Sequence, residues 1–262
     1  AAPARPTEVG AGHSHGPVAV TGTSPVHRLP PQVKLVALVV FVVSVVATAR
    51  DSWWWFAGHA LLLLAAIAVS RVPLRNLLSR MWIELPFVVF AVLMPFVSTG
   101  ARTEVLGVSV SEPGLHAGIA LLIRGTLGVL ASLLFAATTE APDVVRGLDR
   151  LHLPNQLVQI LSFTVRYLDV VTDQLRRMRM AREARGFQAR SVGQWPVLAS
   201  TAGALFIRSY ERGERVHLAM LSRGYGGRMP RAEGEHVAPR RWADGLLLSA
   251  LAVVVAIGSH LT

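Results

Sequence analysis

The stretch KLVALVVFVVSVVATA, residues 34–49, consists almost entirely of Val, Ala, Leu and Phe and has no charged side chain after Lys34. A helix of about 20 such residues crosses the ~30 Å hydrocarbon core of a bilayer. The stretch therefore predicts a membrane-spanning helix. The composition of the whole chain agrees, with 52% hydrophobic and only 16% charged residues and a mean hydropathy of +0.45. Ordinary soluble domains carry about 25% charged residues.

Four more apolar stretches follow the first one. They are residues 53–70, which begin with three tryptophans, WIELPFVVFAVLMPFVS at 82–98, residues 115–137, and residues 242–262. Tryptophan rings prefer the headgroup layer, and Trp82 and Trp242 also stand at stretch ends. We expect an all-α polytopic membrane protein with about five transmembrane helices and a cytoplasmic domain of long amphipathic helices.

The predicted organisation has four parts. These are a flexible tail at 1–31, rich in Pro, Gly, Ala and His, transmembrane helices 1–4 at 32–137, cytoplasmic helices at 138–230, and a linker with transmembrane helix 5 at 231–262. An alternative for the first span is a cleaved signal peptide, because Ala47-Thr48-Ala49 is typical of a cleavage site. The preceding tail is long and carries little positive charge, and four spans follow. These features favour a retained first span.

The charges of the loops predict the orientation. The 71–80 loop carries three arginines and no acid, and the 99–114 loop carries Arg102 against Glu104 and Glu112. Segment 138–241 carries 17 Arg against 10 Asp plus Glu, a net of +7. Because cytoplasmic loops are enriched in basic residues, the N-terminus is predicted to be cytoplasmic. The overall charge of +10 is then a topology signal, and it requires no nucleic-acid partner.

The 138–241 segment is predicted to contain two long amphipathic helices after a short one at 142–151. The first starts at Asn155 after Pro154 and stops at Gly186, about 30 residues or roughly 45 Å. Its apolar stripe consists of Leu157, Ile160, Leu161, Val165, Leu168, Val171, Leu175 and Met178. The second runs from about Pro196 to Gly224. Its predicted inner face consists of Leu198, Ala202, Leu205, Ser209, Val216 and Met220.

Both long helices end in the same pattern. The first ends Ala184-Arg185-Gly186-Phe187, and the second ends Ser222-Arg223-Gly224-Tyr225. Glycine after a helix can adopt the left-handed conformation that ends it, and the aromatic side chain can fold back, with Tyr225 meeting Met220. The arginine would project and could bind carboxylates or carbonyls of a partner. Alternatively, it only complements the helix dipole. The repetition of the pattern favours docking.

These motifs resemble a known transport family. The paired Arg-Gly ends, AATTEAPDVVRGLDRLHLP at 136–154, SYERGERVHLAMLSRGYGGRMP at 209–230 and HRLPPQVKL at 27–35 are similar to the transmembrane T component of energy-coupling factor (ECF) transporters, in its cobalt-type, CbiQ-like branch. Two departures are the Ser that opens the second triplet and the proline at Pro142, which in the family often follows Thr138-Thr139 directly.

The resemblance implies a scaffold in the bacterial inner membrane that couples two ATP-binding-cassette ATPase subunits to a membrane-embedded substrate-binding subunit. It further implies that cobalt or nickel is the substrate and that Ala184, Arg185, Gly186, Ser222, Arg223 and Gly224 dock the ATPases. ATP and Mg would be bound by the ATPases, so the chain itself would hold no cofactor. The chain has no Gly-x-x-x-x-Gly-Lys-Ser/Thr phosphate loop, which excludes ATP hydrolysis by a site of that type.

Other candidate residues carry weaker signals. Arg124 lies within a span, where a central charge costs roughly 2.5–3.5 kcal/mol, so it is predicted to face protein. The residues leave open whether it contacts the substrate subunit, an internal partner such as Glu84, or the interface by snorkelling. His13 and His15 are too few for a metal site, which needs three or four converging donors, so no metal site is predicted.

Two functions from other classes remain as alternatives. A self-sufficient secondary carrier or channel would require internal repeats or ionisable residues along a path, and neither is evident in the sequence. A membrane-bound enzyme would require a catalytic constellation, and none is evident.

Overall fold

The computed structural model describes residues 24–49, 53–105, 108–187, 192–227 and 238–261. The described residues form two compact units, one within residues 24–147 and 238–261 and the other within residues 148–227. In chain order the elements are α1 (Pro31–Ala47), α2 (Trp53–Ser70), α3 (Leu74–Leu78), η1 (Met81–Glu84), α4 (Leu85–Val97), β1 (Arg102–Val105), β2 (Val108–Ser111), α5 (Glu112–Thr138), α6 (Ala141–Arg150), α7 (Asn155–Ala184), η2 (Val192–Gln194), α8 (Trp195–Leu221) and α9 (Pro239–Leu261).

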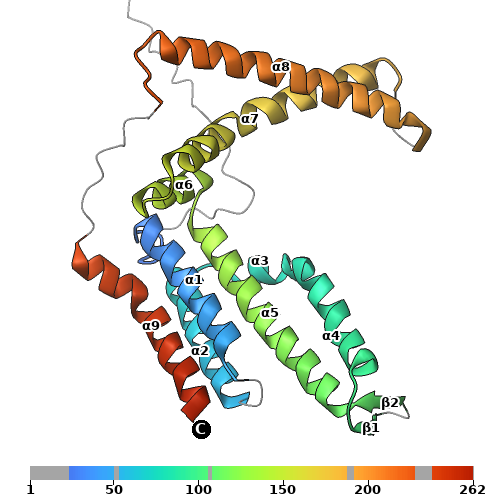
Figure 1. Ribbon diagram of the computed structural model, residues 1–262, viewed down its shortest axis with the longest axis vertical. Helices are drawn as coiled ribbons and strands as arrows, with labels where there is room; N and C mark the ends of the chain where they lie inside the picture. The colour runs from blue at the N-terminus through green and yellow to red at the C-terminus, as the bar shows by residue number, and fades with distance from the viewer. Residues whose placement is uncertain (1–23, 50–52, 106–107, 188–191, 228–237, 262) are drawn as a thin grey trace, which may run out of the picture. The chain divides into compact units, whose positions relative to one another are not determined.

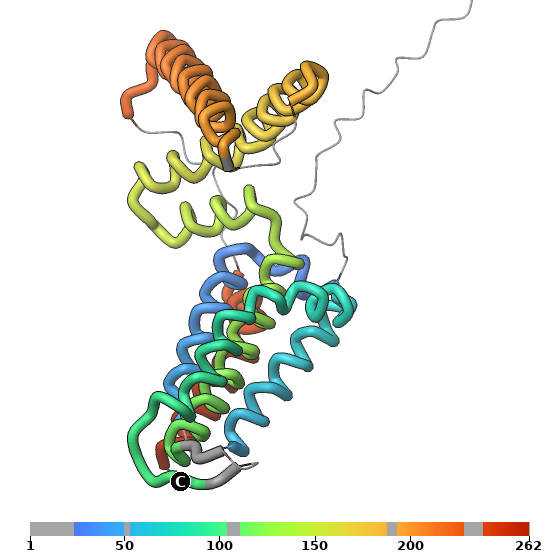
Figure 2. The backbone as a smooth tube through the Cα atoms, turned by 90° about the vertical axis from the view of Figure 1, so that its right-hand side faces the viewer, coloured from blue at the N-terminus to red at the C-terminus, as the bar shows by residue number. Residues whose placement is uncertain are grey.

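The first unit is a bundle of apolar helices, in which α1 packs on α5 and α9, α2 packs on α5 and α9, and α4 packs on α5 (Figures 1 and 2). Among the described residues, α2, α5 and α9 are long and apolar enough to cross a membrane, and Pro31–Ala47 and Met81–Val97 form shorter apolar helices. Large apolar side chains point outward, including Val43 on α1, Leu61 on α2 and Val254 on α9. Water would penalise such faces, whereas lipid tails match them.

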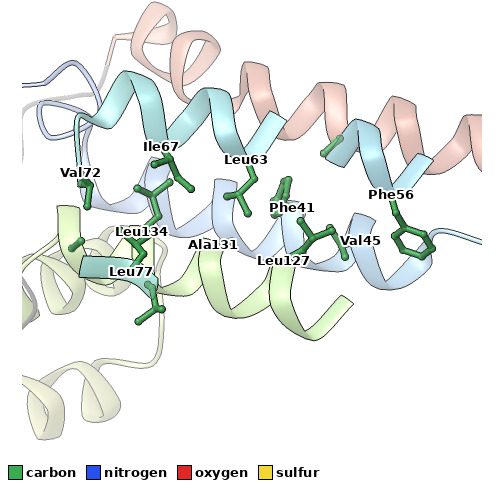
Figure 3. Close-up of a cluster of buried hydrophobic side chains, with 13 residues drawn as sticks. Phe41, Val45, Phe56, Leu63, Ile67, Val72, Leu77, Leu127, Ala131 and Leu134 are labelled. Atoms are coloured by element: carbon green, nitrogen blue, oxygen red, sulfur yellow. The ribbon is translucent and has the colours of Figure 1, made fainter. Parts of the chain in front are cut away.

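The core of this bundle lies where α1, α2 and α5 meet. Figure 3 shows its side chains converging from the three helices. The buried cluster consists of Phe41, Val45, Phe56, Leu63, Ile67, Val72, Leu77, Leu127, Ala131, Leu133, Leu134, Ala137 and Ala252. Because lipid tails are as apolar as these side chains, close packing and not removal from water stabilises the cluster.

Glycines on α5 allow α4 to approach closely. A Cβ atom built at Gly118 would lie 2.5 Å from the carbonyl oxygen of Ala91, and one at Gly114 would lie 2.7 Å from that of Met94. Real side chains do not tolerate such distances, so only glycine permits this contact. Gly114 and Gly118 therefore serve the packing of α5 on α4, as small residues do in membrane bundles.

The third predicted span, residues 82–98, is not one continuous α-helix. The 3-10 turn η1 comes first and is followed by α4, whose 13 residues include Pro86 in the first turn and Pro95 in the interior. Proline is tolerated in a first turn, but farther along a helix its ring clashes with the carbonyl four residues earlier. Pro86 thus sets the start of α4, whose length of about 20 Å is shorter than a bilayer core.

A short hairpin joins α4 to α5. Strands β1 and β2 pair antiparallel, with Arg102 opposite Ser111 and Val105 opposite Val108. The sequence pattern does not predict this hairpin, because four-residue strands leave almost no alternation of apolar and polar residues to detect. The all-α class holds for the described chain apart from this loop.

Candidate functional site

The two long helices of the second unit, α7 and α8, run antiparallel, and side-chain hydrogen bonds join α7 to α8 and to the residues that follow it. The Tyr225 hydroxyl donates to Oε1 of Gln159 at 2.7 Å, and Arg212 donates to Oε1 of Gln174 at 3.5 Å. Arg182 donates to the Thr201 hydroxyl at 3.2 Å. The predicted bounds, 155 to Gly186 and about 196 to Gly224, match α7 and α8 closely.

The contact face of α8 follows the prediction closely. Its half-buried residues include Leu198, Leu205, Ser209, Val216 and Met220, whereas Ala202 is exposed and Thr201 is buried in its place. The stripe on α7 is only partly covered: Val165, Val171 and Met178 are half-buried, but Leu157, Ile160, Leu161, Leu168 and Leu175 remain exposed. A single facing helix covers one side of α7, so the rest of its apolar stripe is left bare.

The C-terminal end of α7, residues Ala184 to Gly186, is called the α7 tip. Gly186 has a φ of +77°, the left-handed region. Its N–H donates to the Glu183 carbonyl at 3.0 Å, and the Phe187 N–H donates to the Arg182 carbonyl at 3.1 Å. These two bonds define a Schellman motif, which satisfies carbonyls that the helix end would otherwise leave unpaired. The Phe187 ring folds back under the Arg182 guanidinium, 5.8 Å from its centroid.

The C-terminal end of α8, Ser222 to Gly224, is called the α8 tip and repeats this geometry. Gly224 has a φ of +82°, and its N–H donates to the Leu221 carbonyl at 3.0 Å. The Tyr225 N–H donates to the Met220 carbonyl at 3.1 Å. The Tyr225 ring lies edge-on to His217, with 6.5 Å between the ring centroids, so the contact of the ring with Met220 stays a prediction. Both tips are therefore closed by the same backbone motif, with an aromatic residue just beyond it.

The arginines of the two tips are available for contact. Arg185 and Arg223 are exposed. Their backbone N–H groups donate to the Arg182 and Met220 carbonyls, each at 3.0 Å, but neither guanidinium group forms a hydrogen bond or ion pair with a side chain or backbone group in the described ranges. Their neighbours behave differently: Arg179 donates to Glu183 at 2.7 Å, and this bond raises the pKa of Arg179 above its ordinary value. Ser222 departs from the family pattern only slightly. Its hydroxyl donates to the Ala219 carbonyl at 2.9 Å, so the serine adds no unpaired polar group.

The two tips lie at opposite ends of the antiparallel pair (Figure 1). Arg182, beside the α7 tip, contacts Thr201 in the first turns of α8, and Tyr225, beside the α8 tip, contacts Gln159 in the first turns of α7. The 23 residues from Gln159 to Arg182 correspond to roughly 35 Å of helix. The pair thus presents two similar, outward-facing arginine ends about that far apart.

Arg124 on α5 has internal partners. It donates to the Thr48 carbonyl at 2.6 Å and lies over the Phe56 ring, 5.6 Å from its centroid. Glu84, which is buried, instead accepts a hydrogen bond from the Thr126 hydroxyl. Nothing in the sequence near Glu84 indicated Thr126 as its partner, because the contact joins segments 42 residues apart.

No cluster of three or more His, Asp or Glu side chains suited to a metal ion occurs within the described ranges. His59 is buried and its Nδ1 is 2.9 Å from the Trp55 carbonyl, while His116 and His260 likewise contact backbone carbonyls. His13 and His15 lie outside the described residues.

Comparisons with known proteins place these features in a family. The sequence model of the CbiQ family, described as cobalt transport protein, matches residues 22–233. The chain is 27% identical over 253 residues to the energy-coupling factor transporter transmembrane protein EcfT of Listeria innocua, covering 90% of this chain and 93% of that protein. It is 29% identical to EcfT of Bacillus selenitireducens, covering 79% and 82%.

A third relative is named as a cobalt transport protein. The chain is 29% identical over 217 residues to the cobalt transport protein CbiQ of Rhodobacter capsulatus, covering 78% of this chain and 83% of that protein. The family match includes both tips, the helices α1 to α8 and the segments that carried the resemblance. Since the match covers most of its length, this chain belongs to the CbiQ family of transmembrane components of energy-coupling factor transporters.

Proposed function

We propose that the chain is the coupling subunit of an ATP-driven uptake transporter, with each tip docked on one ATP-binding-cassette ATPase subunit. The observation that carries the proposal is the pair of tips: two Schellman-closed helix ends, each with an exposed arginine, at opposite ends of one helix pair. Two similar ends suit two similar partners. Exposed guanidinium groups suit carboxylates or backbone carbonyls in the grooves that receive them.

The remaining parts of the proposal follow from the loop charges and the family. The 71–80 loop and the 138–230 segment are cytoplasmic, because the basic excess lies there. The order of the spans then puts the N-terminus on the same side. ATP and Mg are bound by the ATPases, so this chain holds no cofactor and performs no catalysis. A separate membrane-embedded subunit binds the substrate. The printed names of the family and of the Rhodobacter relative favour cobalt, or the similar ion nickel, as that substrate.

The alternative of a self-sufficient carrier is less well supported. The ionisable side chains at mid-span, Arg124 and Glu84, are each held by groups of this chain. They therefore do not form an open polar path along the bundle. The carrier alternative also gives no role to the two repeated tips.

The test is co-purification of the ATPase subunits with an Arg185→Glu, Arg223→Glu variant. A charge-assisted hydrogen bond at each interface contributes about 1.5–3 kcal/mol, so single changes should weaken assembly and the double change should abolish it. The matched control is Arg176→Glu with Arg215→Glu. It makes the same charge change on the same helices, at exposed residues that form only local ion pairs. Normal ATPase recovery by the tip variant would refute the docking assignment.

A further inference from the structure

Lys34 stands out among the basic residues of this chain. The chain has 26 Lys plus Arg residues, and Lys34 is the single lysine. Lysine differs from arginine in having a compact ammonium group with three donors, in place of a planar fork. A site that requires this compact group would explain a lysine in an otherwise arginine-only chain.

The Lys34 ammonium group makes three contacts that join segments far apart in sequence. Its Nζ donates to the Thr138 carbonyl at 2.7 Å, to the His27 carbonyl at 3.3 Å and to the Thr139 hydroxyl at 3.5 Å. Each of the three N–H groups of the ammonium therefore has an acceptor within this chain. Lys34 belongs to α1, Thr138 is the last residue of α5, and Thr139 precedes α6.

These contacts cap the C-terminal end of α5. The last four carbonyls of a helix lack partners within it, and a cation there also complements the helix dipole. Thr138 and Thr139 are both buried, so water would not readily replace the ammonium group. Losing Lys34 would leave the Thr138 carbonyl unpaired in a buried setting.

A second contact fixes α6 to the start of α1. A Cβ atom built at Gly147 would lie 3.0 Å from the backbone nitrogen of Gln32 and 3.1 Å from the Pro31 carbonyl carbon. The backbones of α6 and α1 therefore touch at this glycine. Lys34 and Gly147 together hold the α5–α6 junction on α1.

Side-chain packing alone does not hold this junction. A cavity of about 380 Å³ lies beside it, lined by Leu29, Lys34 and Leu38 on one side and by Leu134, Phe135 and Thr138 on another, with residues of α2 and α9 completing the wall. The polar contacts of Lys34 therefore add to the side-chain packing of α1 on α5 at this end of the bundle.

We propose that Lys34 is a positioning residue for energy coupling, which latches the α5–α6 junction to α1 so that the chain leaves the membrane bundle through a rigid joint. The inference rests on the proposed coupling function, since the joint precedes the helices that carry the tips. A rigid joint would transmit movement of those helices to α5, whereas a loose joint would absorb it.

The test uses pairs of spin labels, for which the cysteine-free chain is a clean background. One pair, at Val43→Cys on α1 and Ala141→Cys on α6, reports on the joint. The control pair, at Val43→Cys and Ser132→Cys on α5, reports on the bundle. All three positions are exposed. In the full-length protein, alone and with its ATPases, we expect a single narrow distance for both pairs.

With Lys34→Met, the 43–141 distance distribution should broaden at least twofold while the 43–132 distribution stays unchanged. A merely structural role would broaden both alike. Gly147→Ala provides a second variant that keeps Lys34, with Gly128→Ala, which meets no neighbouring atom within 4 Å, as its control. An unchanged 43–141 distribution in both variants, or a broad one in the unmodified chain, overturns the latch.

Failure of the latch and failure of the proposed function are distinguishable. The Lys34→Met variant should retain the ATPase subunits in normal amounts, because both tips are intact. If ATPases co-purify but the distances do not respond to Lys34→Met, the latch is wrong and the coupling function stands. If the unmodified chain retains no ATPase, the proposed function fails whatever the spin labels show.

Discussion

Tyr225 donates a hydrogen bond from its hydroxyl to Oε1 of Gln159 across 2.7 Å, which joins the residue just beyond the α8 tip to the first turns of α7. The same glutamine donates from Nε2 to the Gly227 carbonyl at 3.3 Å, so Gln159 holds the chain at Tyr225 and at Gly227, on either side of Gly226. The α8 tip is thereby positioned by the start of the other helix as well as by its own Schellman motif.

Removing the Tyr225 hydroxyl should make the position of the α8 tip less fixed, because the hydrogen bond to Gln159 is lost. Tyr225→Phe keeps the ring that meets His217 edge-on and loses only the hydrogen bond, which contributes about 0.5–1.5 kcal/mol net. We expect a small loss of thermal stability and weaker ATPase recovery at limiting concentration. Tyr210→Phe, a change at an exposed tyrosine on α8, should change neither. Equal effects of the two variants on recovery would show that the bond does not position the tip.

Glycine should be required at the α8 tip because of its left-handed backbone conformation, and not because a larger side chain would clash with a neighbour. At Gly224 the φ of +82° is strained for other residues, although a Cβ would meet no atom within 4 Å. The left-handed conformation costs a non-glycine residue roughly 1–2 kcal/mol, so Gly224→Ala should destabilise the tip and reduce ATPase binding. Gly213→Ala, in the open interior of α8, should instead stabilise the helix by roughly 0.5–1 kcal/mol. Circular dichroism melting and pull-down would measure both, and a stabilised Gly224→Ala variant would contradict the assignment.

The contact between α4 and α5 should be sensitive to a single methyl group. Gly118→Ala would place Cβ 2.5 Å from the Ala91 carbonyl oxygen, and overpacking of this kind costs about 1–3 kcal/mol. Gly128→Ala on the same helix meets nothing within 4 Å and should be tolerated. The readout is the unfolding temperature of each variant in detergent. The prediction is wrong if Gly118→Ala melts at the temperature of Gly128→Ala.

The proposed orientation can be tested by cysteine labelling in intact cells. A membrane-impermeant maleimide should react with Thr103→Cys in the hairpin loop and should not react with Ser79→Cys in the basic loop. Both positions are exposed, so accessibility within the protein does not bias the comparison. Permeabilised cells provide the control, because both cysteines should then react. Labelling of Ser79→Cys alone in intact cells would invert the topology.

The two repeated tips could be recognised from the sequence because their signals are local. A glycine that ends a helix, and the arginine and aromatic residue beside it, lie within four consecutive residues, so backbone rules predict their geometry. The span at 53–70 and the helix from Asn155 were likewise predictable, since long apolar or amphipathic periods mark them directly. The division of 82–98 into a 3-10 turn and a short helix was missed because hydropathy does not register the proline at 86.

The amino-acid sequence by itself determined the class of this protein and the ends of its long helices, because hydropathy, periodicity and glycine placement act over short distances along the chain. The tertiary structure alone decided which partners those helices have. It pairs Glu84 with Thr126, Gln159 with Tyr225 and Lys34 with Thr138, each across more than 40 residues. The physical reason is that such pairs depend on the three-dimensional packing of helices, and helical periodicity predicts which face a residue occupies but not which residue it meets.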